Sequence, residues 1–240
     1  DALDLYVLSV PGGAEKDAAD KLRSDPNVAY AEVNTIQSEN IPAPRAGRPD
    51  TVPSAPSASF NDPYFGYQWN LRNVQAPAAL ASVKGGGVTV AVIGSGVALD
   101  NPELTDRLVA GYDFINNTTT PWDDHGFGTF DAGLIAATAN NSVGIVGVAP
   151  EVRLMPIKAL RRNGNYLEIT PADVVKAVTF ALDNGAKVIH IEAAWDAPSQ
   201  AVADVMALAR SRGAVVVAPA HKAYPASYDG VVGVSALNQD

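Results

Sequence analysis

An uninterrupted apolar run that ends in glycine constrains this fold more than any other stretch of the sequence. Residues 88–93 read Val-Thr-Val-Ala-Val-Ile, and Gly94-Ser95-Gly96 follow directly. Six apolar or β-branched residues without polar alternation indicate a strand buried on both faces, as in parallel sheets. Open α/β sheets bind ligands beyond the carboxyl ends of their strands, so this turn is the first place to look for function.

Strands and helices alternate after that run. Further strands are expected over residues 108–115, 152–159, 187–191, 214–218 and 231–234. Helices are expected over about 128–139, from Thr170 to Gly185 and over about 199–212, with a polar turn at 161–166. Thr170 is a favourable N-cap, and the glycines that end the last two helices suit C-termini. This alternation predicts an α/β fold whose parallel sheet is covered on both faces.

Two further segments precede this core. Residues 1–39 are expected to form a small β-α-β domain, with strands over 3–10 and 28–36 around a helix over 14–24. Residues 40–60 are rich in Pro, Ala and Ser, which indicates an extended linker. The core is therefore expected over residues 61–240.

Composition narrows the classes of partner. The net charge of −9 argues against nucleic acid and anionic membranes. No stretch approaches the ~20 apolar residues of a membrane span. The 240 residues contain no cysteine, so neither disulfides nor thiolate chemistry are available.

Several motifs together resemble the subtilisin-like serine peptidases, or subtilases, and the thermitase-like group in particular. They are Gly126-Phe127-Gly128-Thr129-Phe130, Asn140 to Pro150, Tyr224-Pro225-Ala226 and Asn61 to Phe65. Residues 25–34 also resemble the end of a subtilase propeptide. The resemblance implies an incomplete subtilisin-like sheet preceded by a propeptide-like domain.

The same resemblance places the catalytic positions on unsuitable residues. The family has an aspartate at the position of Gly94 and the basic histidine at Phe127, while Lys222 replaces the asparagine that stabilises the oxyanion. The run Glu192-Ala193-Ala194-Trp195 replaces the glycine-rich substrate segment, and the family's Gly-Thr-Ser-x-Ala-x-Pro element does not occur. Acyl transfer by this route needs a nucleophile, a base and an orienting acid. We therefore expect no catalysis, and a role as a structural or interaction subunit.

A calcium site is a second implication of the resemblance. Relatives wrap a calcium ion with loop carbonyls, one asparagine oxygen, and side-chain oxygens from the mature amino terminus and from the segment after the first strand. Calcium requires six or more oxygens. The matching residues here are Asp62, Glu103, Ala139, Asn141, Val143 and Ile145. The alternative is a loop that keeps its shape by its own hydrogen bonds.

Other readings of the site remain open. A hydrolase with a relocated site would use Ser95 or Asp131 beside His125, with Asp123 or Asp124. The chain would otherwise be a peptidase fragment, or one part of a split or cleaved subtilase. In a loop, His125 is expected to be solvated, and His190 is expected in the core or on a sheet face. His221 beside Lys222 is a better candidate for binding an anionic group.

A protein partner is the last expectation. The strands over 88–94, 152–159, 187–191 and 214–218 suit a sheet covered on both faces, but the sequence ends at Asp240 before the family's central helix. The uncovered face would be an apolar patch larger than monomers usually expose. We therefore expect another chain or another copy over it, in an extracellular or cell-surface setting.

Overall fold

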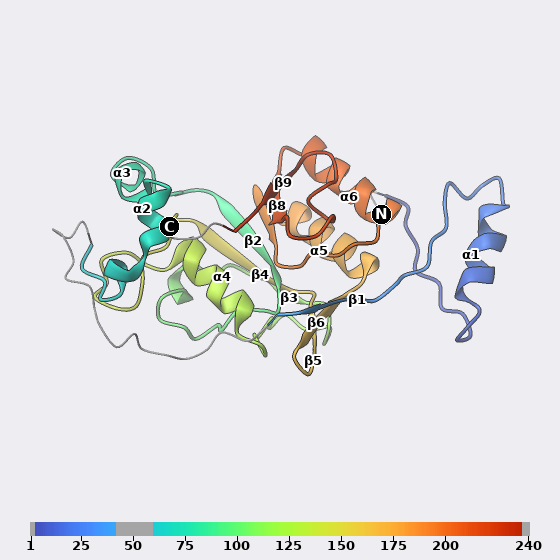
Figure 1. The fold of residues 1–240 in the computed structure, drawn as a ribbon, viewed down its shortest axis with the longest axis horizontal. Helices are drawn as coiled ribbons and strands as arrows, with labels where there is room; N and C mark the ends of the chain where they lie inside the picture. The colour runs from blue at the N-terminus through green and yellow to red at the C-terminus, as the bar shows by residue number, and fades with distance from the viewer. Residues whose placement is uncertain (1–2, 42–59, 237–240) are drawn as a thin grey trace.

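A six-stranded parallel sheet forms the centre of the computed structural model, which describes residues 3–41 and 60–236 (Figure 1). The strands lie in the order β3-β4-β2-β7-β8-β9, and every neighbouring pair is parallel. Their bounds are β2 Thr89–Gly94, β3 Tyr112–Asp113, β4 Arg153–Lys158, β7 Val188–Ile191, β8 Val215–Pro219 and β9 Val231–Val234. The predicted fold class is confirmed, although the strand expected over 108–115 is reduced to β3 and one bridge between Leu108 and Leu154.

Helices cover both faces of the sheet at β2. Ala91 and Ile93 pack with residues of α5 (Pro171–Asp183) and α6 (Gln200–Ser211). Val90 and Val92 point to the other face and pack with Ala132 and Ala136 of α4 (Phe127–Ala136). Successive strand residues point to opposite faces, so an apolar run without alternation is what this position requires.

Local sequence explains where the covering helices begin. Thr170 and Asp173 form a capping box at the start of α5, in which each side chain accepts a hydrogen bond from the other residue's backbone N–H. Ser199 accepts a hydrogen bond from Val202 N at the start of α6. The predicted N-cap at Thr170 is confirmed.

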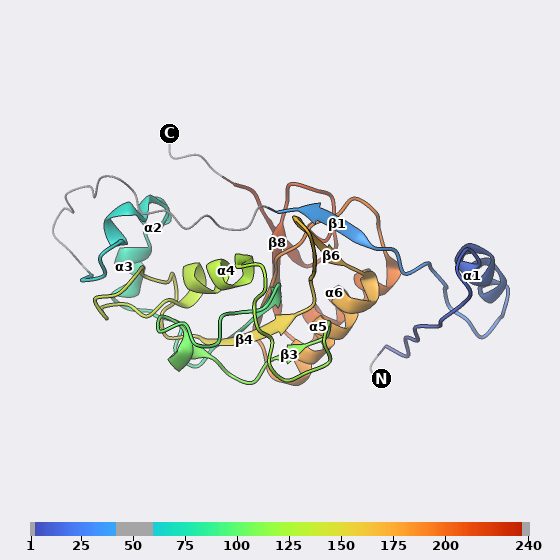
Figure 2. The same ribbon diagram turned by 90° about the horizontal axis from the view of Figure 1, so that it is seen from below.

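A second, antiparallel sheet lies beside the core. It consists of β5 (Arg161–Asn163) and β6 (Tyr166–Ile169), which form a hairpin, and of β1 (Gln37–Asn40), which pairs with β6 (Figure 2). The expectation of a mere polar turn at 161–166 was therefore wrong. Leu167 and Ile169 are buried while their neighbours in β6 are more exposed, which is the alternation of a half-buried strand.

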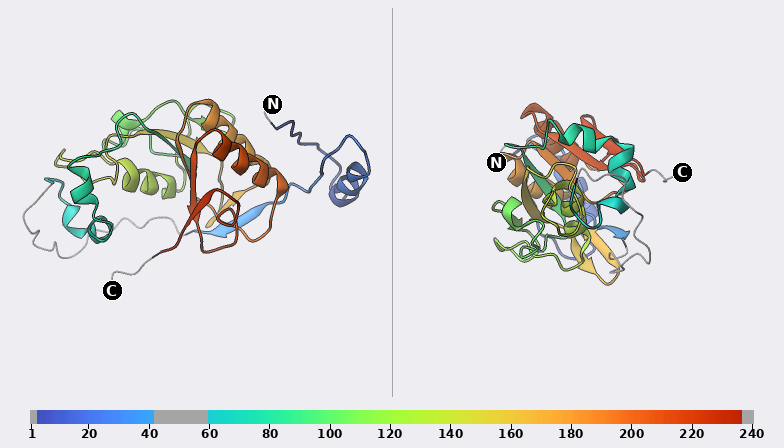
Figure 3. Two further views of the ribbon diagram at one scale, coloured as in Figure 1. Left: turned by 90° about the horizontal axis from the view of Figure 1, so that it is seen from above. Right: turned by 90° about the vertical axis from the view of Figure 1, so that its left-hand side faces the viewer.

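The amino-terminal domain differs from its prediction. Residues 3–36 contain the helix α1 (Glu15–Arg23) but no strand, so the strands expected over 3–10 and 28–36 were wrong. Tyr6, Val7 and Leu8 are at least 60% exposed, and α1 stands apart from the core in Figure 3. The β propensity of Tyr6, Val7 and Leu8 does not by itself make a strand, because a strand also needs a neighbouring strand to accept and donate its hydrogen bonds. Most of the expected linker, residues 42–59, lies outside the described residues.

Short helices at the start of the core pack against Ala139 and Val146 at the two ends of the loop over 139–145. They are the 3-10 helix η1 (Phe65–Tyr67) and the α-helices α2 (Trp69–Asn73) and α3 (Ala76–Leu80). A second 3-10 helix, η2 (Thr105–Arg107), lies between β2 and β3. Two reciprocal hydrogen bonds of 2.8 Å connect the Gln68 amide to the backbone of Val146. Within residues 3–41 and 60–236, no helix is long and apolar enough to cross a membrane.

Candidate functional site

The carboxyl end of β2 meets the amino terminus of α4 at very close range. Gly128 N donates to Ser95 Oγ at 3.0 Å, and Ala98 N donates to Thr129 Oγ1 at 2.9 Å. A Cβ atom on Gly128 would collide with the carbonyl oxygen of Gly96, so glycine is required here by space. These contacts bring positions 94 and 127 to one place.

Phe127 opens α4 and carries no group that can exchange a proton. Its ring stacks on that of Phe130, with a centroid distance of 6.2 Å and an interplanar angle of 23°. Phe130 is 49% exposed, so the pair covers part of the helix surface. An aromatic hydrocarbon neither accepts nor donates a proton, so this position offers no general base.

Glu192 occupies the space beside Gly94 that a side chain at position 94 would need. A Cβ atom on Gly94 would lie 2.7 Å from Glu192 Cδ and would collide with Oε2. Glu192 follows β7 directly, is 3% exposed, and accepts a hydrogen bond of 2.9 Å from Ser95 N. A carboxyl group therefore lies at the end of β2 although residue 94 has none.

Burial makes this carboxyl group a weak acid. Desolvation raises the pKa of Glu192 well above its ordinary value, and the nearby charges of Asp131 and Asp123 raise it further, against the opposing effect of the Ser95 N–H. Its Oε1 atom has no hydrogen-bond partner among the described residues. The sequence analysis considered Glu192 only as part of a run that replaces a glycine-rich segment. An acidic residue directly after a buried strand is the sequence signal that could have identified it as a site residue.

His190 and Asp131 form a second polar pair on the α4 face of the sheet. Asp131 Oδ2 lies 2.7 Å from His190 Nε2, and both side chains are largely but not fully buried. The sheet-face placement of His190 is confirmed. The strands expected from the sequence are not uniformly apolar, because His190 lies in β7 and the buried Lys158 ends β4.

The relocated triad considered from the sequence is not assembled. His125 is buried at 8% exposed, not solvated as expected, and its Nδ1 has no partner among the described residues. Ser95 Oγ donates to Asp123 at 2.9 Å and not to His125. Asp131 pairs with His190, while Asp124 pairs with Lys158 at 2.7 Å.

Asp123 is the hydrogen-bonding centre of the turn that precedes α4. Burial raises its pKa, but hydrogen bonds from Thr129, Gly126 and His125 outweigh burial, so the pKa of Asp123 is lowered. A carboxylate that accepts this many backbone donors holds a loop in one shape. The role of Asp123 is thus to position the start of α4.

We call residues 3–41 the amino-terminal arm. An acidic side chain of this arm already contacts His221, which was expected from the sequence to bind an anionic group. Glu39, in β1, contacts His221 Nε2 and accepts a hydrogen bond of 3.2 Å from Ala194 N. Lys222 is half-buried and makes no side-chain hydrogen bond to a described residue. His221 and the backbone N–H of Ala194 therefore hold a carboxylate of the same chain.

Two buried carboxylates converge on the loop over 139–145. Asp62 accepts hydrogen bonds from the backbone N–H groups of Asn140 (2.8 Å) and Asn141 (3.4 Å). Glu103 accepts from Asn141 Nδ2 at 2.7 Å and from Ile145 N at 3.2 Å.

The backbone of this loop is shaped around Glu103. Gly144 has φ +53°, and a Cβ atom there would lie 2.7 Å from Glu103 Oε2. Asn141 Oδ1 accepts from Val143 N at 2.9 Å. Ala139, Val143 and Ile145 can offer only backbone oxygens, so the donor set consists of hard oxygen atoms, the type that calcium prefers. No group of three or more His, Cys, Asp or Glu suited to a metal occurs among the described residues.

Comparison with known proteins agrees with the motifs. Residues 85–240 match the model of the subtilase family, Peptidase S8. Thermitase of Thermoactinomyces vulgaris is 35% identical over 187 residues, which cover 75% of this chain and 66% of thermitase. A thermophilic serine proteinase of a Bacillus species is 37% identical over 187 residues, covering 75% of this chain and 46% of that protein.

Two other similarities extend this picture. The minor extracellular protease of Bacillus subtilis is 28% identical over 242 residues, which cover 98% of this chain and 35% of that protein. A solved protease structure of Pseudoalteromonas arctica superimposes with a TM-score of 0.69 at 25% identity, covering 76% of this chain and 67% of that one. The chain thus spans from about a third to two thirds of these relatives.

Proposed function

The chain belongs to the subtilase family, and on that premise we propose that it is a catalytically inactive member that serves as a structural or interaction subunit of a larger assembly. One observation carries the proposal. Phe127 stands at the start of α4 where the family has its basic histidine, and its ring stacks on Phe130. Without a base to remove its proton, a serine hydroxyl remains a poor nucleophile.

The surroundings of Gly94 support the same conclusion. The family's orienting aspartate is missing, and Glu192 fills its space while bound to Ser95 N. A substitution that restored the acid at position 94 would collide with Glu192. The packing around Gly94 leaves no room for an acidic side chain at that position, which supports the proposal.

Peptide cleavage tests this proposal. A broad peptide library incubated with the protein and analysed by mass spectrometry should show no cleavage above background, with subtilisin as the positive control. The double variant with Gly94→Asp and Phe127→His should be equally inactive. Cleavage of any library peptide by the purified wild-type protein, at a site absent from the blank, would contradict the proposal.

An apolar patch on the sheet supports a role in assembly. We call the side chains of Val188, Val215, Val217, Val232 and Val234 the valine face. The strand register places them on the same face of the sheet as Val90 and Val92, which α4 covers at β2. Val215, Val232 and Val234 are 47–51% exposed. The proposed occupant is another protein chain or another copy of this one. Light scattering should detect association, and a monomer that unfolds cooperatively and binds no surface-sensitive dye would contradict it.

The amino-terminal arm is proposed to remain attached. Glu32 accepts hydrogen bonds from Ser199 Oγ and Gln200 N at the start of α6, and Asn34 Oδ1 accepts from Ala172 N in α5. With β1 paired to β6, these contacts hold residues 30–40 on the core. Intact-mass measurement on protein from its native source should retain residues 1–39; a major species that begins between Ile41 and Asn61 would contradict this.

Calcium binding and an extracellular location complete the proposal. Asp62 and Glu103 lie at the loop over 139–145 with oxygen ligands of the type that calcium requires. The loop's own hydrogen bonds, however, satisfy many of its groups without an ion.

Extracellular or cell-surface localisation is supported by the relative named as an extracellular protease. Detection of the protein in the culture medium or cell-surface fraction of its source organism tests it, and a wholly intracellular protein would contradict it.

A further inference from the structure

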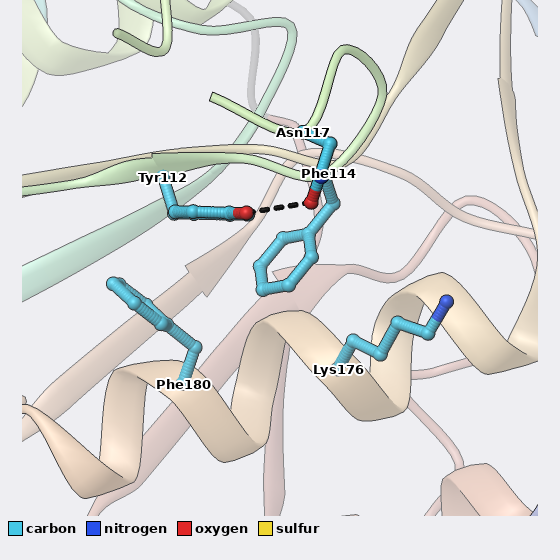
Figure 4. A pocket seen from close by; sticks show the side chains of 5 residues that line it. All are labelled: Tyr112, Phe114, Asn117, Lys176 and Phe180. Carbon is cyan, nitrogen blue, oxygen red and sulfur yellow. Dashed lines mark hydrogen bonds between the residues drawn. The ribbon is translucent and has the colours of Figure 1, made fainter. Parts of the chain in front are cut away.

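A small open cavity lies between β3 and α5, apart from the hydrogen-bond network around Gly94. Its volume is about 330 Å³, and it is lined by Tyr112, Phe114, Asn117, Lys176 and Phe180 (Figure 4). This volume is near the lower end of the range for small-molecule pockets. It therefore suits a ligand with a single ring.

Three aromatic rings form the wall of this cavity. The ring centroids of Tyr112 and Phe114 are 4.8 Å apart, and Phe180 lies 5.7 Å from the first and 5.9 Å from the second. All three side chains are half-buried, so each ring is fixed by its neighbours and still presents surface to solvent. Such a wall offers edge-to-face or offset stacking to a further aromatic ring.

The polar groups at the cavity are hydrogen-bond donors. Tyr112 OH donates to Asn117 Oδ1 at 2.6 Å, which engages the amide oxygen and leaves the amide NH₂ free to donate. Lys176 lies four residues before Phe180, on the same face of α5 (Figure 4). Its ammonium is exposed and forms no ion pair within residues 3–41 and 60–236. No carboxylate lines the cavity.

We propose that this cavity binds a small arylalkanoate, with its ring against the aromatic wall and its carboxylate at Lys176 and the Asn117 amide. The chain as a whole has a net charge of −9, but the lining of this cavity contains one cation, Lys176, and no acidic residue. A carboxylate therefore complements the charge of the cavity. A cationic ligand would meet the Lys176 ammonium, and so would the ammonium of a free aromatic amino acid. The proposal is independent of whether the chain is an active peptidase.

A titration followed by ¹H–¹⁵N NMR on the full chain tests the site, with 3-phenylpropionate as the probe. Saturable shifts should be confined to the amides of residues 112–117 and 176–180. The uncharged 3-phenylpropionamide should bind about tenfold more weakly, because hydrogen bonds to charged groups contribute more than neutral ones. Lys176→Met should weaken the acid about tenfold, whereas Lys187→Met, which removes an exposed lysine elsewhere, should not change its affinity.

A second pair of variants tests the aromatic wall. Phe180→Leu should weaken binding by about threefold to tenfold, as expected for the loss of one aromatic contact. Phe130→Leu removes an exposed ring outside the cavity and should have no effect. Absence of saturable shifts would overturn the proposal, and so would equal binding of the acid and the amide, or an equal loss in the two lysine variants. If Phe180→Leu fails to fold, the comparison of acid with amide on the wild-type chain still decides.

Discussion

Replacement of Glu192 by glutamine should change the way that stability depends on pH. Glutamine keeps the shape of the side chain and an oxygen that can accept the Ser95 N–H, but it cannot ionise. In the wild type, burial and the charges of Asp131 and Asp123 raise the folded-state pKa of Glu192 above the ordinary value of 4.5. The native protein therefore holds this proton more tightly than the unfolded chain does.

The sign of the effect follows from this difference. Below pH 4.5 the group is protonated in both states, and its contribution to stability is fully present. As the pH rises above 4.5, the unfolded chain loses the proton first, so each further pH unit costs the native state about 1.4 kcal/mol until the folded-state pKa is passed. Asp123 acts in the opposite direction and at lower pH, because its pKa is lowered from 3.8.

Urea unfolding at pH 4, 5, 6 and 7 measures the effect. The free energy of unfolding of Glu192→Gln, relative to wild type, should rise across this series by about 1.4 kcal/mol per pH unit within the window. Glu15→Gln, at an exposed position, is the matched control, and its free energy of unfolding should change with pH as that of the wild type does. Parallel curves for Glu192→Gln as well would refute the reasoning, because they would mean that Glu192 titrates alike in both states.

Three further predictions concern the site and its supports. Gly94→Ala should destabilise the fold by about 2 kcal/mol in urea unfolding, because Glu192 must leave Ser95 N unpaired. Glu192→Ala should suppress this cost in the double variant. Gly86→Ala is the control and should be nearly neutral, because its added Cβ would make only an ordinary contact of 3.5 Å with Glu151. Thr170→Ala should cost about 1 kcal/mol through loss of the capping box, and an unchanged unfolding midpoint would contradict that role. Calcium at a hundredfold excess over its dissociation constant should stabilise by about 2.7 kcal/mol relative to chelator, and equal thermal midpoints would leave the loop a purely structural element.

The core could be predicted from sequence because local and global signals agree there. The run over 88–94 is apolar on both faces, and the structure covers it with α4 on one side and with α5 and α6 on the other. Thr170 specifies its own helix start through contacts three residues away. Elements that depend on distant partners were predicted less well. Residues 3–10 have the composition of a strand, but they pair with no strand among the described residues.

Local motifs point to part of the candidate site, and the remaining contacts leave no local signal. Phe127 and Gly94 could be located from motifs, since glycines at fixed spacing bring β2 and α4 together. The place of Glu192 beside Gly94 depends on the pairing of β2 with β7, which joins residues about 97 positions apart. The pairs of Asp131 with His190 and of Glu39 with His221 also connect separate elements. Side chains that meet across a fold leave no local pattern in the sequence.

The absence of an activated serine is the central claim, and active-site labelling tests it most directly. A fluorophosphonate reacts with a serine whose hydroxyl is activated by a base, and Phe127 provides none. Protein purified from its native source, treated with the probe beside subtilisin and analysed by intact mass, should remain unlabelled while subtilisin is labelled fully. Stoichiometric addition of one phosphonyl group to a serine of this protein would contradict the account.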